Sequence, residues 1–263
     1  MQRKLIVPAG ALMLSTCLGA FAQVKNETGA PAWGIGLGAV ARTSIYAGES
    51  SSFMPVPLLS YEGENFFWRG IGGGFHVLNQ GGFKLDATVG ARLNGVKKDD
   101  FGVAQLAAKG INRNLLADRH DGLDVGIAGS FKGQTGAVEL ALKGDVAGAS
   151  RGLETSAKFS YPLHWRSTLV APNIAVHHYS NELANYYYGT RDEEVARGVV
   201  NYKPGSTSIL RIGVDVMRPF ADQWVFIGNL SYSALPGEIT NSPLVDKDTK
   251  GVTSVFIGVS RRF

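Results

Sequence analysis

The carboxyl-terminal segment, residues 252–263, alternates in polarity and ends on an aromatic side chain. In an extended strand, one face of this segment is apolar and carries Val255, Ile257, Val259 and Phe263. The other face is small or polar and carries Ser254, Gly258, Ser260 and Arg262, with Phe256 as its one large member. A transmembrane β-barrel needs such a last strand, because pairing it with the first strand removes the sheet edge. The segment therefore favours a membrane barrel over a soluble domain.

The amino-terminal segment has the pattern of a secretory signal peptide. Arg3 and Lys4 precede a mostly apolar run over residues 5–18, and Ala20-Phe21-Ala22 supplies a small-x-small cleavage pattern. The run is too short to span a bilayer comfortably, which disfavours the alternative of an uncleaved anchor. We expect a signal peptide over residues 1–22 and one barrel domain over residues 23–263. Cys17 is the only cysteine, so the mature chain has no disulfide and no thiolate site.

Composition is consistent with a barrel and argues against several other classes. The part after residue 22 has no apolar run long enough for a transmembrane helix. The chain has 34 glycines and 10% aromatic residues, as expected for strands that are apolar on one face only. The net charge is +4 with no basic run, so nothing indicates a nucleic-acid partner.

Alternation recurs along the chain and predicts an all-β, antiparallel transmembrane barrel. Eleven segments read as strands: 33–42, 54–61, 66–78, 83–94, 123–132, 136–146, 153–161, 169–178, 209–218, 224–233 and 252–263. Their polar faces carry charges of both signs, which we expect to line the lumen: Lys84, Asp86, Arg92, Asp124, Lys132, Glu139, Lys143, Asp145, Arg211 and Asp215. A soluble sandwich also alternates, but charges of both signs can neutralise one another inside a small barrel.

Connection lengths alternate in the way that distinguishes the two ends of an outer-membrane barrel. Residues 132–134, 161–165 and 218–224 are tight turns, whereas residues 96–122, 180–207 and 236–251 are long and polar. We expect short periplasmic turns and long extracellular loops. Trp165 and Trp224 follow tight turns, where an interfacial aromatic girdle would lie, and Tyr161 and Phe220 add to it.

The strand count carries a further expectation. A single-chain barrel with both ends in the periplasm needs an even number of strands. We therefore expect about twelve strands, with ten as the fallback, and one strand hidden near residues 70–74 or 185–188. At this size side chains should largely fill the interior.

Candidate sites are few, and the sequence indicates no enzyme and no cofactor. His177 and His178 are adjacent and so face opposite sides of a strand, which disfavours a metal site with the nearby His164. Asp118-Arg119-His120-Asp121 is the one local candidate for a catalytic pair, against the simpler interpretation of an ion-paired loop. Tyr186, Tyr187 and Tyr188 are a candidate partner-contact loop, with a strand end in the aromatic girdle as the alternative.

Three segments resemble the MipA/OmpV family of MltA-interacting proteins. They are residues 55–70 (PVPLLSYEGENFFWRG), Tyr186-Tyr187-Tyr188-Gly189 followed by Glu193-Glu194, and residues 238–245 (EITNSPLV). The resemblance covers nearly the whole mature chain. It implies an outer-membrane β-barrel and, for the namesake, a scaffold that links a lytic transglycosylase to a murein synthase. The family commonly ends in Tyr-x-Phe, whereas Arg261 occupies the tyrosine position here, so Phe263 is the expected assembly signal.

Three functions follow as expectations. The leading one is a non-enzymatic barrel that binds murein-remodelling enzymes at the periplasmic face. The alternatives are a narrow porin or stress-response channel, and an adhesin that acts through the extracellular loops. The expected partners are outer-membrane lipid, the barrel-assembly machinery and, through the resemblance, a lytic transglycosylase and a murein synthase.

Overall fold

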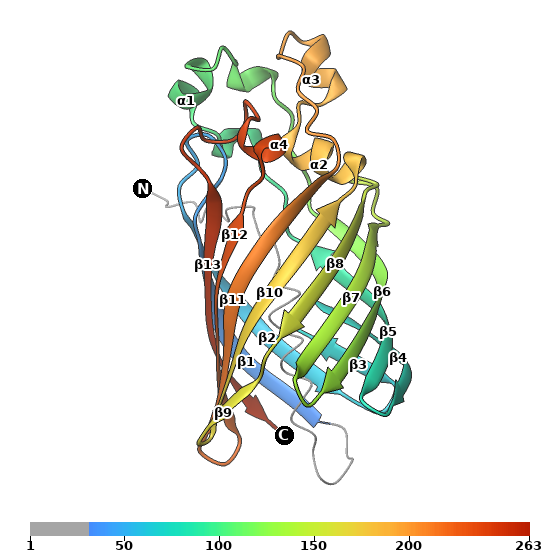
Figure 1. Cartoon of the computed structure of the whole chain (residues 1–263). Coiled ribbons are helices and arrows are strands. Elements are labelled where there is room, and N and C mark those ends of the chain that lie inside the picture. The colour runs from blue at the N-terminus through green and yellow to red at the C-terminus, as the bar shows by residue number, and fades with distance from the viewer. Residues whose placement is uncertain (1–31) are drawn as a thin grey trace.

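The computed structural model describes residues 32–263, which form one barrel with a helical cap at one end (Figure 1). The predicted signal peptide, residues 1–22, lies outside the described residues. The strands are β1 Ala32–Arg42, β2 Ser52–Glu62, β3 Phe66–Arg69, β4 Gly72–Gln80, β5 Phe83–Arg92, β6 Gly122–Gly133, β7 Gly136–Asp145, β8 Leu153–Ser160, β9 Leu163–Trp165, β10 Thr168–Tyr179, β11 Thr207–Phe220, β12 Trp224–Ala234 and β13 Gly251–Arg262. The helices are η2 Lys98–Asp100, α1 Val103–Ala107, η3 Arg113–Leu115, α2 Asn181–Tyr188, α3 Asp192–Ala196 and α4 Gly237–Thr240. Within residues 32–263, no helix has the length and apolar character needed to cross a membrane.

The sheet closes on itself, and the last strand forms the seam. β13 pairs antiparallel with β1 from Gly34↔Arg262 to Arg42↔Ser254 and also pairs with β12. β10 pairs with β8 on one side and β11 on the other, which completes the ring. Beyond the last strand residue, the Phe263 amide donates to the Trp33 carbonyl at 2.9 Å. The expectation of a closed antiparallel barrel is confirmed, as is the expected face of Phe256, which is buried inside.

Within residues 32–263, twelve strands form the barrel wall, and there is one additional short strand. The short strand β9 pairs with the first residues of β10, and β8 pairs with the later residues of β10. β8 and β9 therefore occupy the same place in the wall, one after the other along β10. The strand missing from the sequence count comes from residues 66–78, which a turn at Gly70 divides into β3 and β4. Gly70 has a φ of 64°, a left-handed conformation that glycine adopts without a Cβ penalty. The other suspected place was wrong, because residues 185–188 belong to helix α2.

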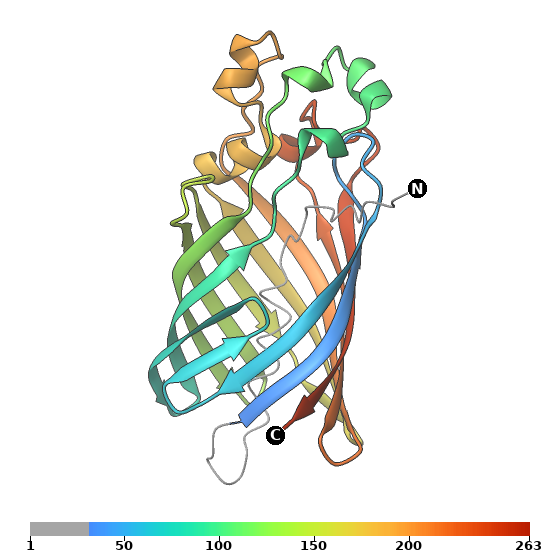
Figure 2. The ribbon, with the colours of Figure 1, turned by 180° about the vertical axis from the view of Figure 1, so that it is seen from behind.

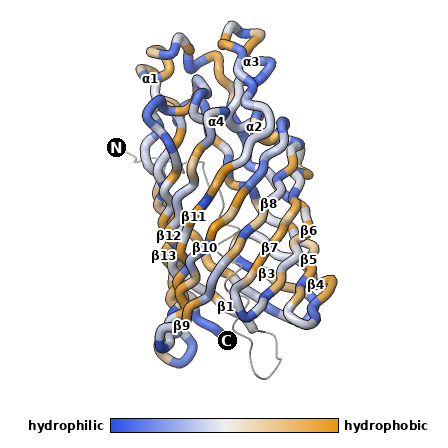
Figure 3. The backbone as a smooth tube through the Cα atoms, viewed as in Figure 1, coloured by the Kyte–Doolittle hydropathy of each residue, from blue (hydrophilic) through white to orange (hydrophobic). Residues whose placement is uncertain are grey.

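Side chains alternate between a lipid-facing and an interior face, as the sequence predicts. Ile35 and Leu37 on β1 are 57% and 73% exposed, whereas Val40 on the opposite face is 8% exposed. Figure 3 shows apolar positions distributed along the strands, and many of these side chains are exposed, among them Leu123, Ile127 and Leu140. All the aromatics expected near the tight turns are exposed, from Trp224 at 40% to Trp165 at 73%. This exposure fits the expected interfacial girdle.

The two ends of the barrel differ in their connections. Helices α1, α2, α3 and α4 all lie in loops at one end, whereas the carboxyl terminus and the tight turns lie at the other (Figures 1 and 2). We call these the cap end and the turn end. The predicted alternation of short turns and long loops is confirmed, and by the barrel convention the turn end faces the periplasm.

Candidate functional site: the capped mouth and the charged lumen

The long loops pack against one another and form a folded cap. We define the cap as the connections over residues 43–51, 93–121, 180–206 and 235–250. All four contribute side chains to one buried apolar cluster, which includes Tyr46, Leu106, Leu183, Tyr187 and Leu244. Leu106, Leu183 and Leu244 are each 0% exposed. Apolar burial of this kind stabilises a fixed loop arrangement over the mouth, in contrast to a set of independent loops.

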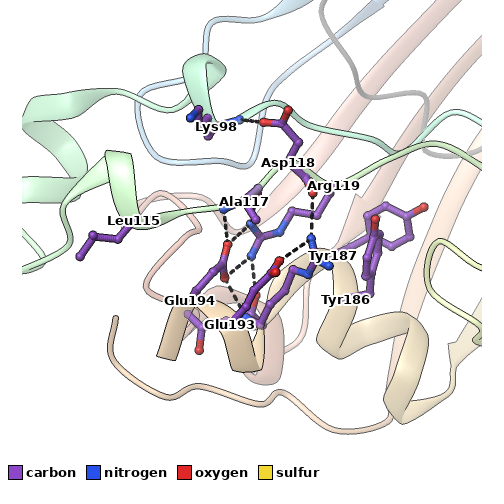
Figure 4. A network of polar contacts seen from close by, with 12 residues as sticks. Lys98, Leu115, Ala117, Asp118, Arg119, Tyr186, Tyr187, Glu193 and Glu194 are labelled. Carbon is purple, nitrogen blue, oxygen red and sulfur yellow. Dashed lines mark hydrogen bonds and ion pairs between the residues drawn. The ribbon is translucent and has the colours of Figure 1, made fainter. Parts of the chain in front are cut away.

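An ion pair buried inside the cap joins two of these loops. Arg119 precedes β6, and Glu194 lies on α3. The Arg119 Nη1 and Nη2 atoms lie 2.5 Å and 2.9 Å from the two carboxylate oxygens of Glu194, and both side chains are 0% exposed. Figure 4 shows that backbone groups complete the network. Arg119 donates to the Ala117 and Gly189 carbonyls, and Glu194 accepts from the Ala117 amide at 2.8 Å.

The candidate catalytic segment is an ion-paired loop, as the simpler interpretation held. Arg119 pairs with Glu194, which is 75 residues away in sequence. Asp118 accepts from the Lys98 amide at 2.8 Å, and Asp121 accepts from the Gly95 amide at 2.7 Å. Both carboxylates therefore hold backbone within the same loop. The sequence contains no spacing signal for the Arg119–Glu194 pair, because it depends on how two loops fold together.

The tyrosine triplet lies on a helix that faces the cap core. Ser180 caps α2 by accepting from the Leu183 amide. Tyr187 and Tyr188 are 1% and 0% exposed, so both rings belong to the cap core. The strand alternative is wrong, because residues 181–188 form a helix. Tyr186 is half-buried, and its hydroxyl accepts from the His120 amide at 2.9 Å.

Hydroxyl groups in the cap remain protonated donors. The Tyr46 hydroxyl donates to the Tyr187 carbonyl at 3.1 Å, and the Tyr187 hydroxyl donates to the His120 carbonyl at 3.2 Å. Burial raises the pKa of Tyr46, Tyr187 and Tyr188 well above the ordinary value for a phenol. Both hydrogen bonds therefore persist through the physiological pH range. The Tyr46 bond ties residues 43–51 to α2, and the Tyr187 bond ties α2 to residues 93–121.

Below the cap, one wall of the lumen carries a chain of charges. Arg92 lies at the end of β5 and contacts carboxylates on two other strands. Its Nη2 lies 2.6 Å from Asp124, and its Nη1 donates to Glu154 at 2.7 Å. Glu154 also contacts the Nδ1 atom of His177 at 3.0 Å. All four side chains are buried, so the charges compensate one another away from solvent.

A second cluster centres on Asp215 of β11. Its carboxylate accepts from Asn229 at 2.6 Å and Asn173 at 2.9 Å, and Lys158 lies 3.3 Å away. Three other strands (β8, β10 and β12) therefore meet at one carboxylate. These strands are neighbours in the sheet, so the polar contacts run along the lumen wall at this level.

The ten predicted lumen charges all occupy strand positions that alternate with the exposed apolar side chains. Arg92, Asp124, Arg211 and Asp215 are buried. The remaining predicted members are half-buried, apart from Lys132, which is exposed at the turn end: Lys84, Asp86, Glu139, Lys143 and Asp145. The prediction omitted a third cluster, in which Glu62 contacts Arg69 at 3.0 Å and His76 contacts Asp86 at 2.6 Å. The sequence predicts one strand over residues 66–78, and this single strand does not show that Arg69 and His76 both face the lumen.

The histidines do not converge on a metal site. His177 faces the lumen, whereas His178 faces outward and contacts Ser208 at 3.0 Å. Within residues 32–263, no three histidine, cysteine or acidic side chains form a cluster that could hold a metal ion.

Sequence comparison connects this architecture to one family. A family model described as MltA-interacting protein MipA matches residues 35–263, which is the whole barrel but for the start of β1. The chain belongs to the MltA-interacting protein (MipA) family.

Two individual relatives align with this chain over nearly their whole length. The MltA-interacting protein of Escherichia coli (strain K12) is 29% identical over 253 residues, which cover 96% of this chain and 98% of the relative. The outer membrane protein OmpV of Vibrio cholerae serotype O1 is 20% identical and is covered to 94%, as is this chain. Among solved structures, the translocator domain of the autotransporter NalP from Neisseria meningitidis has a TM-score of 0.50 at 14% identity, covering 94% of this chain and 93% of that domain. The last likeness concerns the fold alone. This chain is therefore an outer-membrane barrel protein of the MipA family.

The tail carries Arg261 where the resemblance leads us to expect a tyrosine, and the structure shows the contacts of this residue. The Arg261 guanidinium donates to the Gln223 side chain at 3.0 Å and lies 5.1 Å from the centre of the Phe263 ring. Both Arg261 and Phe263 are exposed at the turn end. The arginine at this position thus makes a cation–π contact with the terminal ring, which stays largely exposed.

Proposed function

We propose that this barrel acts by binding a murein-remodelling enzyme, of the lytic transglycosylase class, at its turn end. The observation that carries the proposal is the folded cap, whose core residues Leu106, Leu183 and Leu244 are fully buried. A mouth filled in this way disfavours solute flow as the main activity and leaves the turn end as the accessible rim. The barrel convention places that rim in the periplasm, where murein enzymes work.

The charge of the turn-end rim supports a protein partner. Its exposed charged side chains are four basic and two acidic: Lys132, Arg166, Arg218, Arg261, Glu64 and Asp222. Exposed charges at a rim steer association and set specificity more than they add affinity. A net positive rim fits an acidic surface on the partner.

Family membership indicates which enzyme to test first. The Escherichia coli relative is named for interaction with MltA and matches this chain along its whole length. The experiment is capture of a purified lytic transglycosylase by the immobilised full-length barrel in mild detergent. Recovery above that of an unrelated barrel of similar size supports the proposal, and recovery equal to that barrel contradicts it.

The channel alternative has a direct measurement of its own. The cap core packs over the mouth, and the clusters around Arg92 and Asp215 line the lumen wall below it. We expect little steady current in planar bilayers. Sustained, ion-selective conductance of the wild-type protein would favour transport over binding.

A further inference from the structure

The barrel wall is incompletely paired beside β2. β2 pairs with β1 along its whole length, from Ala32↔Glu62 to Arg42↔Ser52. On its other side it pairs with β3 only at Ser60, Tyr61 and Glu62. One further hydrogen bond, from the Gly70 amide to the Leu59 carbonyl at 2.8 Å, ends the contact. Residues 52–58, the cap-side half of β2, therefore have no strand on that side within the described chain.

The strand on the far side of this gap does not reach across it. The β3–β4 hairpin lies in the half of the barrel away from the cap (Figure 1). Its tip bonds to β5 through the Ala91 amide and the Ile71 carbonyl at 3.1 Å. Closer to the cap, the chain after β5 makes its hydrogen bonds on the side away from β2. The Val96 amide donates to the Arg119 carbonyl, and the Gly95 amide donates to Asp121, both on the side of β6.

The unpaired edge of β2 is chemically suited to remain unpaired. The Leu59 carbonyl points toward β3, and the strand period of two gives the backbone groups of Phe53, Pro55 and Pro57 the same direction. Proline has no N–H, so two of these three positions have no donor to satisfy. In a membrane an unsatisfied backbone group costs several kcal/mol, and prolines on an edge also prevent pairing with another strand. The edge therefore disfavours a protein strand as its neighbour.

The interior behind this edge is apolar, unlike the charged wall around Arg92. Val56 and Leu58 face inward and are 4% and 6% exposed. They pack in one cluster with Met54, Ile71 and Leu93, which are partly buried and lie along the gap. On the outer face of the same edge, Phe53 is 66% exposed toward lipid. Apolar side chains thus continue from the outer wall, past the edge, to the interior cluster.

We propose that this gap beside β2, bounded by residues 52–58 and 93–96, is a lateral binding site for the hydrocarbon chain of a membrane lipid. A hydrocarbon chain needs no hydrogen bond from the edge and gains apolar contact with Met54, Val56 and Leu58. A neighbouring strand would instead meet an edge that lacks two donors. The site is separate from the rim proposed for the enzyme partner, because it opens through the wall near the cap.

Photocross-linking from inside the wall tests this site. The barrel is folded into vesicles of dioleoylphosphatidylcholine with p-benzoylphenylalanine at Met54, and the products are weighed by mass spectrometry. Phe53, which faces outward beside it, is the positive control. Ser156 is the matched negative control, because it faces inward near the cap end but its strand pairs on both sides, with Ala141 and His177.

The proposal predicts a mass increase of one phosphatidylcholine at position 54, at a yield close to that at position 53 and several-fold above that at position 156. A heat-modifiable gel shift selects folded barrels, and a second probe at Leu58 replaces Met54 if that variant does not fold. A lipid cross-linking yield at Met54 and Leu58 that equals the yield at Ser156 would overturn the proposal. So would a cross-linked protein dimer in place of the lipid adduct.

Discussion

Arg119 and Glu194 form a fully buried ion pair that connects the loop before β6 to helix α3 inside the cap. Their other hydrogen-bond partners, the backbone groups of Ala117, Gly189 and Arg191, all lie in the cap loops, so the pair acts between loops. The cap is thus held by an apolar core and by a fully buried charge pair within it. A substitution in this pair should therefore loosen the cap while the barrel stays folded.

The first prediction concerns that pair. Glu194→Gln keeps the side-chain shape but leaves the Arg119 charge buried without a counter-charge, which costs about 3–5 kcal/mol. We expect the loops to become sensitive to limited proteolysis while the barrel keeps its heat-modifiable gel shift. Glu193→Gln is the matched control, because the Glu193 side chain is 48% exposed and its pair with Arg191 contributes only about 0–1 kcal/mol. Equal protease resistance of the wild type and Glu194→Gln would contradict this role.

The second prediction concerns the Asp215 cluster in the lumen. Asp215→Asn removes the charge that faces Lys158 and weakens the contacts of Asn173 and Asn229. Breaking a buried pair typically costs about 3–5 kcal/mol. We expect the temperature at which the folded band disappears from a gel to fall. Asp222→Asn, on an exposed turn, should leave that temperature unchanged, and an equal fall in both variants would count against a specific lumen role.

The third prediction is a pH dependence in the cap. Burial raises the pKa of Glu49 above its ordinary value, while the Ser44 hydroxyl opposes this by donating to the carboxylate. The folded cap therefore binds the Glu49 proton more tightly than the unfolded loop does. This contribution to stability is present at acidic pH and is lost as the pH rises from the unfolded pKa through the raised one. Glu49→Gln should flatten the dependence of protease resistance on pH in this range, and an unchanged profile would contradict it.

The fourth prediction concerns assembly. Phe263 is bound to β1 by its amide but exposes 63% of its surface at the turn end. Its ring is therefore available to the barrel-assembly machinery. Deleting Phe263 should lower the yield of folded barrel in the outer membrane, measured by fractionation. Arg261→Tyr, which restores the family pattern, should not lower it, and normal yields after the deletion would refute the role of Phe263.

The sequence predicts those parts of the fold that depend on local alternation. The closing strand, the charged inner face and the two classes of connection all follow from a period of two, and Phe256 is correctly placed inside. The β3–β4 division was harder to locate, because β3 has only four residues and its turn lies within a glycine run. Helix α2 was missed, although Ser180 before residues 181–188 supplies an N-cap signal. The Arg119–Glu194 pair could not be predicted, because it depends on the relative placement of two loops that no local pattern encodes.

Charge reversal at the two ends of the barrel tests the central claim most directly. One variant reverses three exposed rim charges (Arg166→Glu, Arg218→Glu and Arg261→Glu), and the control reverses three exposed cap charges (Lys97→Glu, Lys247→Glu and Lys250→Glu). Both are compared with the wild type for capture of a lytic transglycosylase at fixed ionic strength. The account predicts that the rim variant loses most of the capture, whereas the cap variant retains it. Equal capture by the rim variant and the wild type, or loss confined to the cap variant, would contradict binding at the turn end.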